Sequence, residues 1–194
     1  PEDYLPQPEQ ATSALALADL DGDGDLDLVT GASAAPDGVF LRLQLKTPGA
    51  FVEAPPGLLP APPGPVAQLV AGDLDGDGDV DFVAICAGAQ DRLYVNDGAA
   101  HFFDATEVAM PLDFADGTDA LLEDLDLDGD LDLVIANHLF QNRLYLNDGE
   151  GRFLDYTPIL PIRQDPSTAV LAVDVENDFD ADLDSFDSDS FGGV

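Results

Sequence analysis

Positively charged residues are scarce in this chain of 194 residues, which has 6 lysine and arginine residues against 40 aspartate and glutamate residues. The formal net charge is −34. This balance argues against a nucleic-acid partner, because a phosphate backbone is bound through clustered lysine and arginine. An anionic membrane surface is disfavoured for the same reason. Since so many carboxylates repel one another in a compact state, cations are the obvious means of neutralising them.

Cysteine and long apolar runs are also lacking. The single cysteine, Cys86, cannot form an internal disulfide, and its apolar neighbours predict a small buried core residue. No stretch approaches the ~20 apolar residues that a membrane-spanning helix needs. The hydrophobic fraction is nevertheless 45%, which is too high for a chain that cannot bury a core. The sequence therefore predicts one folded domain without a membrane span.

Aspartate is concentrated in four clusters of nine residues. We call them the first to fourth acidic loops, and they occupy residues 19–27, 73–81, 124–132 and 174–182. Their first residues are 54, 51 and 50 positions apart, and a period of about 50 residues indicates repeated units, as in propellers and solenoids. The predicted organisation is a single repeat domain, 1–194, comprising an N-terminal strand and lead-in (1–13), repeats at 14–65, 66–117 and 118–166, and a partial, degenerate repeat at 167–194.

Each unit carries the pattern of four short strands. Apolar runs too short for typical helices flank the acidic loops, so they predict the two strands of a hairpin. Further along, Asn-Asp-Gly at residues 96–98 and 147–149 lies between aromatic or branched segments and predicts a tight turn. Four strands per unit are typical of propeller blades. We therefore predict an all-β fold of propeller-type repeats, about four four-stranded antiparallel blades, with the Pro-rich residues 55–65 as an ordered connection.

The two ends of the chain are related to each other. The last unit has room for little more than one strand after Asp182, while residues 3–14 resemble residues 155–169, where one blade ends and the next begins. An N-terminal strand would therefore complete the last blade, either within one chain or in a neighbouring molecule. The second arrangement is head-to-tail strand exchange, which gives a homo-oligomer or, if it does not close, a filament.

The acidic loops have the composition of a cation site. Carboxylates stand at loop positions 1, 3, 5 and 9, position 7 offers a backbone carbonyl, and a glycine at position 6 permits a sharp bend. Such a loop suits a hard cation with 6–8 oxygen ligands, and calcium is favoured over the smaller, more hydrated magnesium. The candidate metal ligands are Asp19, Asp21, Asp23, Asp25, Asp27, Asp73, Asp75, Asp77, Asp79, Asp81, Asp124, Asp126, Asp128, Asp130, Asp132, Asp174, Glu176, Asp178, Asp180 and Asp182.

Two features qualify this interpretation. An EF-hand is rejected, because it requires Glu at position 12 and flanking helices, whereas these loops have Thr30, Ala84 and Ile135 there and strand-like flanks. In the fourth loop Phe179 replaces the glycine, so we expect a weak, distorted or empty site.

The acidic loop between two strands, followed by RLYVNDG at residues 92–98 and RLYLNDGEGRF at residues 143–153, resembles the FG-GAP/VCBS repeats. Such repeats form integrin α-subunit propellers and occur in many secreted bacterial proteins. The resemblance covers residues 14 to 182 and implies a calcium-stabilised β-propeller that is usually extracellular. Family propellers commonly have seven blades. A four-bladed ring, a piece of a larger protein and a polymer of part-propellers all remain open.

Catalysis is not expected. The two histidines, His101 and His138, fall at a hairpin and a strand end, and no nucleophile or nucleotide-binding motif is present. A structural or adhesive role outside the cell, as a surface or filament subunit, is the favoured function. A propeller module that binds a glycan or a protein is the alternative, and a hydrolase accessory domain is a third, weaker one.

Overall fold

The computed structural model describes residues 12–32, 41–47, 50–62, 64–162 and 166–173, and the backbone of residues 182–187. They form three four-stranded antiparallel sheets, each with its strands in chain order, and a two-stranded sheet. We call the sheets blades 1 to 4. Blade 1 comprises β1 (Ala14–Ala18), β2 (Asp27–Gly31), β3 (Leu41–Thr47) and β4 (Ala50–Glu53); blade 2 comprises β5 (Val66–Gly72), β6 (Asp81–Cys86), β7 (Arg92–Asn96) and β8 (Phe102–Asp104). Blade 3 comprises β9 (Gly117–Glu123), β10 (Asp132–Asn137), β11 (Arg143–Asn147) and β12 (Phe153–Asp155); blade 4 comprises β13 (Ser167–Val173) and β14 (Asp182–Asp187).

This architecture confirms the predicted all-β class, and three of the predicted blades are four-stranded and antiparallel. The helical segments are short: α1 (Thr106–Ala109) follows blade 2 and the 3-10 turn η1 (Thr157–Ile159) follows blade 3. No helix in the described ranges has the length and apolar character to cross a membrane. The predicted N-terminal strand lies almost wholly outside the described residues.

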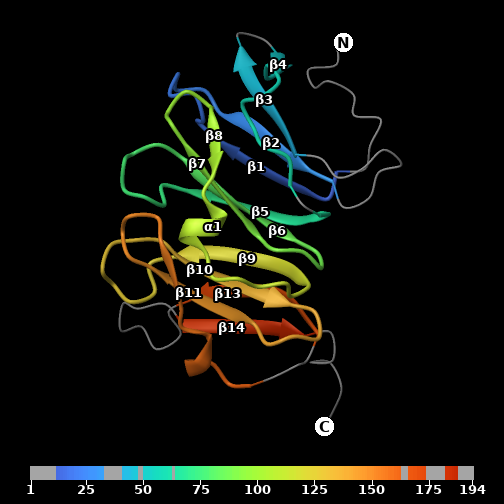
Figure 1. The fold of residues 1–194 in the computed structure, drawn as a ribbon, viewed down its shortest axis with the longest axis vertical. Helices are drawn as coiled ribbons and strands as arrows, with labels where there is room; N and C mark the ends of the chain where they lie inside the picture. The colour runs from blue at the N-terminus through green and yellow to red at the C-terminus, as the bar shows by residue number, and fades with distance from the viewer. Residues whose placement is uncertain are drawn as a thin grey trace.

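The blades stack face to face in a column (Figure 1). Their first strands follow one another, since β5 contacts both β1 and β9, and β9 contacts β13. β1 and β13 lie at opposite ends of the column (Figure 1). The described blades therefore form an open stack, and neither end blade covers the other.

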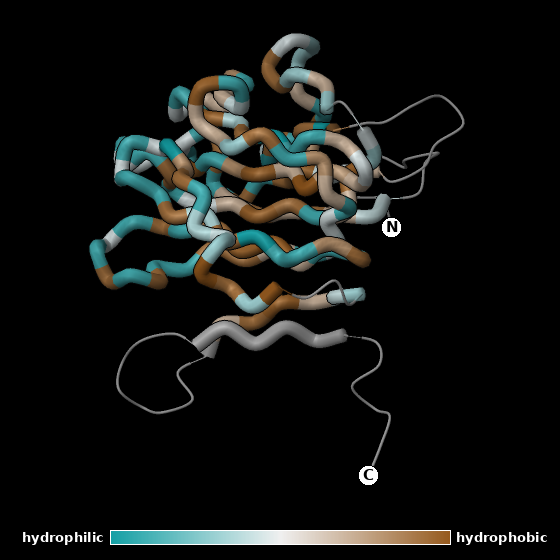
Figure 2. The backbone as a smooth tube through the Cα atoms, turned by 60° about the horizontal axis from the view of Figure 1, so that its bottom comes forward, coloured by the Kyte–Doolittle hydropathy of each residue, from teal (hydrophilic) through white to brown (hydrophobic). Residues whose placement is uncertain are grey.

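The hydrophobic core lies between the blades. All six residues of β6 are buried; Phe82 and Ala84 pack toward blade 1, whereas Val83 and Ile85 pack toward blade 3. A strand buried on both faces reads as a continuous apolar run, which is the pattern of residues 82–86. Figure 2 shows apolar residues along the stacked strands and hydrophilic residues gathered in loops beside them. Cys86 is buried and free, as predicted.

The Pro-rich connection between blades 1 and 2 is ordered over its described residues, as predicted. Leu58 and Leu59 pack against the core between these blades. The backbone N–H of Phe102, in the last strand of blade 2, donates to the carbonyl of Leu58 at 2.7 Å. The segment is therefore part of the blade packing.

The two ends of the stack expose apolar side chains. In β1, the alanines pack toward blade 2, while Leu15 and Leu17 are 58% and 52% exposed. The residue of β5 that is equivalent to Leu15 is Leu69, which faces blade 1 and is only 5% exposed. At the other end Leu171 of β13 is 49% exposed. The outer face of blade 1 thus exposes leucines, whereas the equivalent face of blade 2 is buried against blade 1.

Candidate metal centres

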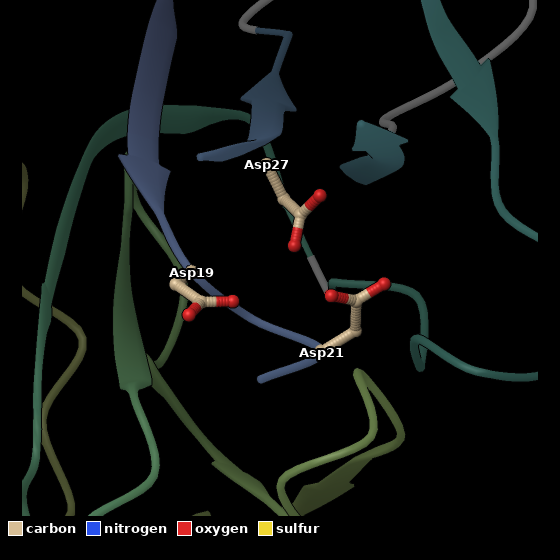
Figure 3. Close-up of side chains that lie close together, drawn as sticks. All are labelled: Asp19, Asp21 and Asp27. Atoms are coloured by element: carbon tan, nitrogen blue, oxygen red, sulfur yellow. The ribbon is translucent and has the colours of Figure 1, made fainter. Parts of the chain in front are cut away.

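Each of the first three acidic loops connects the first two strands of its blade. In each loop the carboxylates at positions 1, 3 and 9 converge, with one oxygen from each within 4.8 Å of the other two. Figure 3 shows this convergence in the first loop. The three triads are Asp19, Asp21 and Asp27; Asp73, Asp75 and Asp81; and Asp124, Asp126 and Asp132.

Positions 5 and 7 lie outside these triads. The position 5 carboxylates accept a hydrogen bond from the backbone N–H two residues later, at 2.9 Å for Asp23, 2.9 Å for Asp77 and 3.1 Å for Asp128. At position 7, the carboxylates of Asp79 and Asp130 lie against Gly98 and Gly149 of their own blades. The side chains of Asp79 and Asp130 are therefore packed against a turn. A ligand role for position 7, through its backbone carbonyl, stays a prediction.

In the first loop, position 1 supplies an oxygen that fits a cation. Asp19 accepts a hydrogen bond from Gly24 through Oδ2 at 3.0 Å. Its other oxygen, Oδ1, is buried and finds no hydrogen-bond partner among the described residues. A buried, unpaired carboxylate oxygen is costly unless a cation or a donor meets it. With two more carboxylates beside it, a divalent ion with oxygen ligands would satisfy this atom.

Position 9 has a second role that sequence reasoning missed. Asp81 is fully buried, and its two oxygens accept the backbone N–H groups of Leu74 at 2.9 Å and Asn96 at 2.8 Å. Asp27 and Asp132 hold the equivalent N–H groups in their blades. Each carboxylate therefore ties the start of its acidic loop to the third strand. Because an oxygen that accepts one hydrogen bond keeps a free lone pair, the same atoms can also meet a cation.

Burial raises the pKa of five of the carboxyls in these loops. Desolvation raises the pKa of Asp81 to about 6, although the N–H groups of Asn96 and Leu74 oppose the shift. Desolvation is also the largest cause of the raised pKa of Asp21, and the neighbouring charges of Asp27 and Asp23 add to it. The pKa values of Asp75, Asp126 and Asp132 are raised as well, again mainly by desolvation. Ionised carboxylates are thus crowded at a free-energy cost that a divalent cation would relieve.

The bends in the loops depend on residues with positive φ. The position 6 glycines adopt φ of 91°, 94° and 102° at Gly24, Gly78 and Gly129, as the predicted sharp bend requires. Position 4 is also left-handed, and here the third loop differs: the first two loops have glycine, whereas Leu127 adopts φ of 63°.

Two asparagines that were predicted only as turn residues join adjacent blades. The side-chain Nδ2 of Asn96 donates to the carbonyl of Leu20, in the first loop, at 2.9 Å. Asn147 donates in the same way to Leu74, in the second loop, at 2.8 Å. The available signal was their common spacing, since each lies 15 residues after the buried aspartate of its own loop.

Of the fourth acidic loop, the structure describes only the last residue, Asp182. Asp182 begins β14 and pairs with Val173 through the backbone. The other predicted ligands of this loop, Asp174, Glu176, Asp178 and Asp180, lie outside the described residues.

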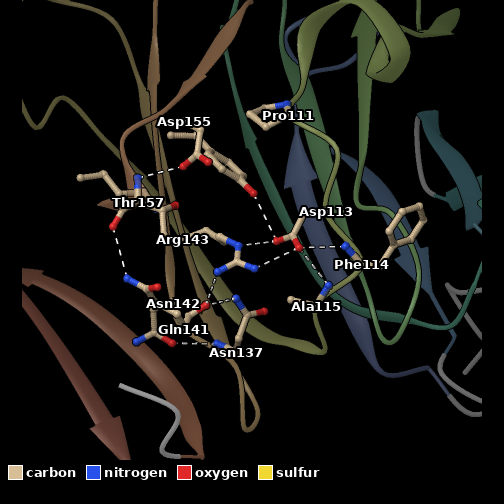
Figure 4. A network of polar contacts seen from close by, with 12 residues as sticks. Pro111, Asp113, Phe114, Ala115, Asn137, Gln141, Asn142, Arg143, Asp155 and Thr157 are labelled. Atoms are coloured by element: carbon tan, nitrogen blue, oxygen red, sulfur yellow. Dashed lines mark hydrogen bonds and ion pairs between the residues drawn. The ribbon is translucent and has the colours of Figure 1, made fainter. Parts of the chain in front are cut away.

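A separate polar network lies between blade 3 and the segment that precedes it (Figure 4). Arg143 donates to Asp113 through Nε at 2.6 Å and Nη2 at 3.1 Å, and the hydroxyl of Tyr145 donates to Asp113 at 3.2 Å. In blade 2 the equivalent Arg92 pairs with Asp104 at 3.4 Å. Asp113 therefore fixes the entry to blade 3 through a charged pair.

The described residues form a stack of antiparallel blades, three of them four-stranded, with acidic loops that join the first two strands. This arrangement defines a propeller-type repeat module. A sequence model of the FG-GAP-like repeat matches the chain three times, over residues 19–84, 73–135 and 124–183. The chain belongs to the FG-GAP-like repeat family, as the resemblance indicated. A search of curated proteins gave no match.

Proposed function

We propose that this protein is an extracellular, non-catalytic repeat module whose fold calcium stabilises, with a structural or adhesive role. The observation that carries the proposal is the convergence of three aspartate carboxylates in each of three successive loops. The buried, unpaired Oδ1 of Asp19 supports a cation there. Asp19, Asp21 and Asp27, with their equivalents in the next two loops, would hold the ions.

Charge supports a location in calcium-rich surroundings. Three calcium ions would change the formal net charge from −34 to −28. The ions would thus act where the carboxylates crowd, while the remaining surface stays strongly acidic. Such neutralisation couples folding to metal binding, because the unfolded chain has no preformed site.

Thermal unfolding with and without calcium tests this proposal. At a calcium concentration about 100-fold above the dissociation constant, each site adds about 2.7 kcal/mol. The unfolding midpoint should therefore rise by at least about 5 °C over that in EGTA. Magnesium at equal concentration should give a smaller shift, because it prefers a smaller octahedral shell. Equal midpoints in calcium and EGTA would overturn the proposal.

We further propose self-association through the ends of the stack. Leu15 and Leu17 at one end and Leu171 at the other are exposed, although the equivalent faces inside the stack are buried. Covering one end with the other gives a head-to-tail contact, which yields a ring or a filament. Strand exchange by residues 1–13 would add to this contact.

Light scattering tests the end contact. The paired change Leu15→Asp and Leu17→Asp should reduce the size of any oligomer, whereas Val108→Asp, at a still more exposed apolar residue of α1, should not. Deletion of residues 1–10 tests the strand-exchange part separately. An intact chain that is monomeric at high concentration would contradict self-association and favour a monomeric binding module.

One observation favours the alternative of a ligand-binding module. A cavity of about 460 Å³ lies beside the Asp113 network, and both polar and apolar residues line it, among them Gln141, Tyr145 and Ile162. A glycan or a peptide could use such a mixed lining. Calorimetric titration with glycans would test this role, and the change Gln141→Ala should weaken any binding found.

A further inference from the structure

We propose that Asn96 and Asn147 are positioning residues that make calcium binding in one acidic loop depend on the following blade. This inference rests on the proposed function, because the ion is calcium. It concerns how contacts from one blade affect the calcium affinity of the preceding loop. The first loop would depend on blade 2, and the second loop on blade 3.

The contacts of the two asparagines define the coupling. Asn147 belongs to blade 3, and its Nδ2 donates to Leu131 in its own loop at 3.3 Å and to Leu74 in the preceding loop at 2.8 Å. Asn96 likewise donates to Val80 at 3.1 Å and to Leu20 at 2.9 Å. Both asparagines are buried. One amide group thus holds two acidic loops in register.

These bonds extend to the candidate ligands. The backbone of Leu74 makes both links, because its N–H donates to Asp81 and its carbonyl accepts from the side-chain amide of Asn147. The backbone N–H of Asn147 in turn donates to Asp132. The equivalent bonds occur between blades 1 and 2, where Leu20 donates to Asp27 and accepts from Asn96. A continuous series of hydrogen bonds therefore joins the three buried carboxylates, in the order Asp27, Leu20, Asn96, Asp81, Leu74, Asn147 and Asp132.

Close packing of the turns also indicates that each of the first two acidic loops depends on the blade that follows it. A Cβ atom on Gly76 of the second loop would lie 3.3 Å from the carbonyl oxygen of Gly149 in blade 3. For Gly22 of the first loop, the corresponding distance to the carbonyl of Gly98 is 3.4 Å. The Asn-Asp-Gly turn of each following blade therefore lies directly on the preceding acidic loop.

The third loop has no such cover within the described ranges. Its position 4 residue, Leu127, is exposed, and so is Asp126, whereas Asp21 and Asp75 are half-buried. The first two loops are thus covered by the turn of the next blade, whereas the third loop has only its own blade around it among the described residues. An ion that draws a loop together also fixes the backbone at loop position 2, which is Leu20 in the first loop and Leu74 in the second. Because the asparagine of the next blade donates to that backbone carbonyl, the bound ion favours the asparagine contact. By reciprocity, the asparagine contact favours binding of the ion.

Chains with one working loop test the inference. The changes Asp73→Asn, Asp124→Asn and Asp174→Asn leave only the first loop intact. Calcium affinity is then measured by isothermal titration calorimetry, with and without Asn96→Ala. Loss of this outer contact should weaken binding by about ten- to a hundredfold. If Asn96 supported only its own blade, the affinity of the first loop would not change.

The second loop provides an independent comparison. In a chain with Asp19→Asn, Asp124→Asn and Asp174→Asn, the change Asn147→Ala should weaken calcium binding by a similar factor. Asn137→Ala is the matched control in both chains, since Asn137 is a buried asparagine that donates to Gln141 at the opposite end of blade 3. It should leave both affinities within about twofold, by the near-additivity of distant sites. If alanine prevents folding, Asn96→Ser and Asn147→Ser keep a donor too short to bridge the loops.

The outcomes separate this inference from the proposed function. Calcium binding by the unaltered chain, with affinities that neither asparagine change alters, would overturn the inference alone. An unaltered chain that binds no calcium would overturn both. Weakening by Asn137→Ala equal to that by Asn96→Ala would also overturn the inference, because the effect would then reflect general destabilisation.

Discussion

The side-chain amide of Asn147 donates to the backbone carbonyl of Leu74, which lies 73 residues earlier in the preceding blade. The bond measures 2.8 Å and is buried. The Asn-Asp-Gly segment therefore does more than turn the chain between two strands. It also fixes the spacing between successive acidic loops, so the loop and the turn act as one unit across the blade boundary.

The first prediction concerns the buried aspartate at loop position 9. Asp81→Ala should lower the free energy of unfolding by about 3 kcal/mol even in EGTA, because two buried backbone N–H groups lose their acceptor. Urea denaturation in EGTA measures this value. Asp77→Ala is the control: Asp77 is exposed, so its loss should cost about 0.5 kcal/mol or less. Equal effects of the two changes would refute the anchoring role.

The strands and the loops could be predicted from sequence because the same pattern recurs in every unit. Short apolar runs on both sides of an acidic loop have one simple solution, a hairpin, and Asn-Asp-Gly marks the next turn. The convergence of Asp19, Asp21 and Asp27 followed from their alternate spacing on a bending chain. The structure adds that the third carboxylate, Asp27, also binds backbone N–H groups.

The contacts between blades could not be predicted in this way. Asn96 and Leu20 are 76 residues apart, and no local pattern relates them. Their contact depends on how far one blade is rotated on the next, which side-chain packing in the core determines. The conformation of Leu127 was equally hidden, because nothing in the local sequence indicates that a leucine adopts a left-handed φ of 63°.

The second prediction is a pH dependence that arises from Asp91, away from the acidic loops. Its side chain accepts the N–H of Cys86 at 2.7 Å, and the residue is 8% exposed. Burial raises the pKa of Asp91 to about 7, well above its ordinary value near 3.9. Between these values the folded chain binds a proton that the unfolded chain does not. Its stability from this group is therefore present at low pH and is lost as the pH rises toward 7.

Comparison with Asp91→Asn isolates this effect. The difference in unfolding free energy between the unaltered chain and the variant should fall by about 1 kcal/mol per pH unit from pH 5 to pH 7. Above pH 8 it should be constant. Urea denaturation at saturating calcium measures both chains, so calcium effects common to them cancel. Parallel stability curves over this range would show that Asp91 titrates normally.

The third prediction uses the left-handed leucine of the third loop. Leu127 has φ of 63° and is 63% exposed, so its side chain contributes little packing. Leu127→Gly should stabilise the fold by about 0.5 kcal/mol, because relief of the left-handed strain exceeds the added entropy of the unfolded glycine. Leu26→Gly is the control, since Leu26 is similarly exposed and is not among the residues with positive φ. It should destabilise the fold, and stabilisation by both changes would point to loss of exposed apolar surface instead.

The fourth prediction concerns the pair between Asp113 and Arg143, whose side chains are largely buried. Asp113→Ala should cost about 3 kcal/mol, because it leaves the Arg143 guanidinium partly buried without its carboxylate. Arg143→Met should also destabilise the fold, since it leaves the Asp113 charge with the Tyr145 hydroxyl and the N–H groups of Phe114 and Ala115. The double variant should lose about 1–3 kcal/mol less than the sum of the single losses, as expected for directly coupled groups. Chemical denaturation of the four chains in calcium gives this coupling, and strictly additive losses would mean that the two side chains do not stabilise each other.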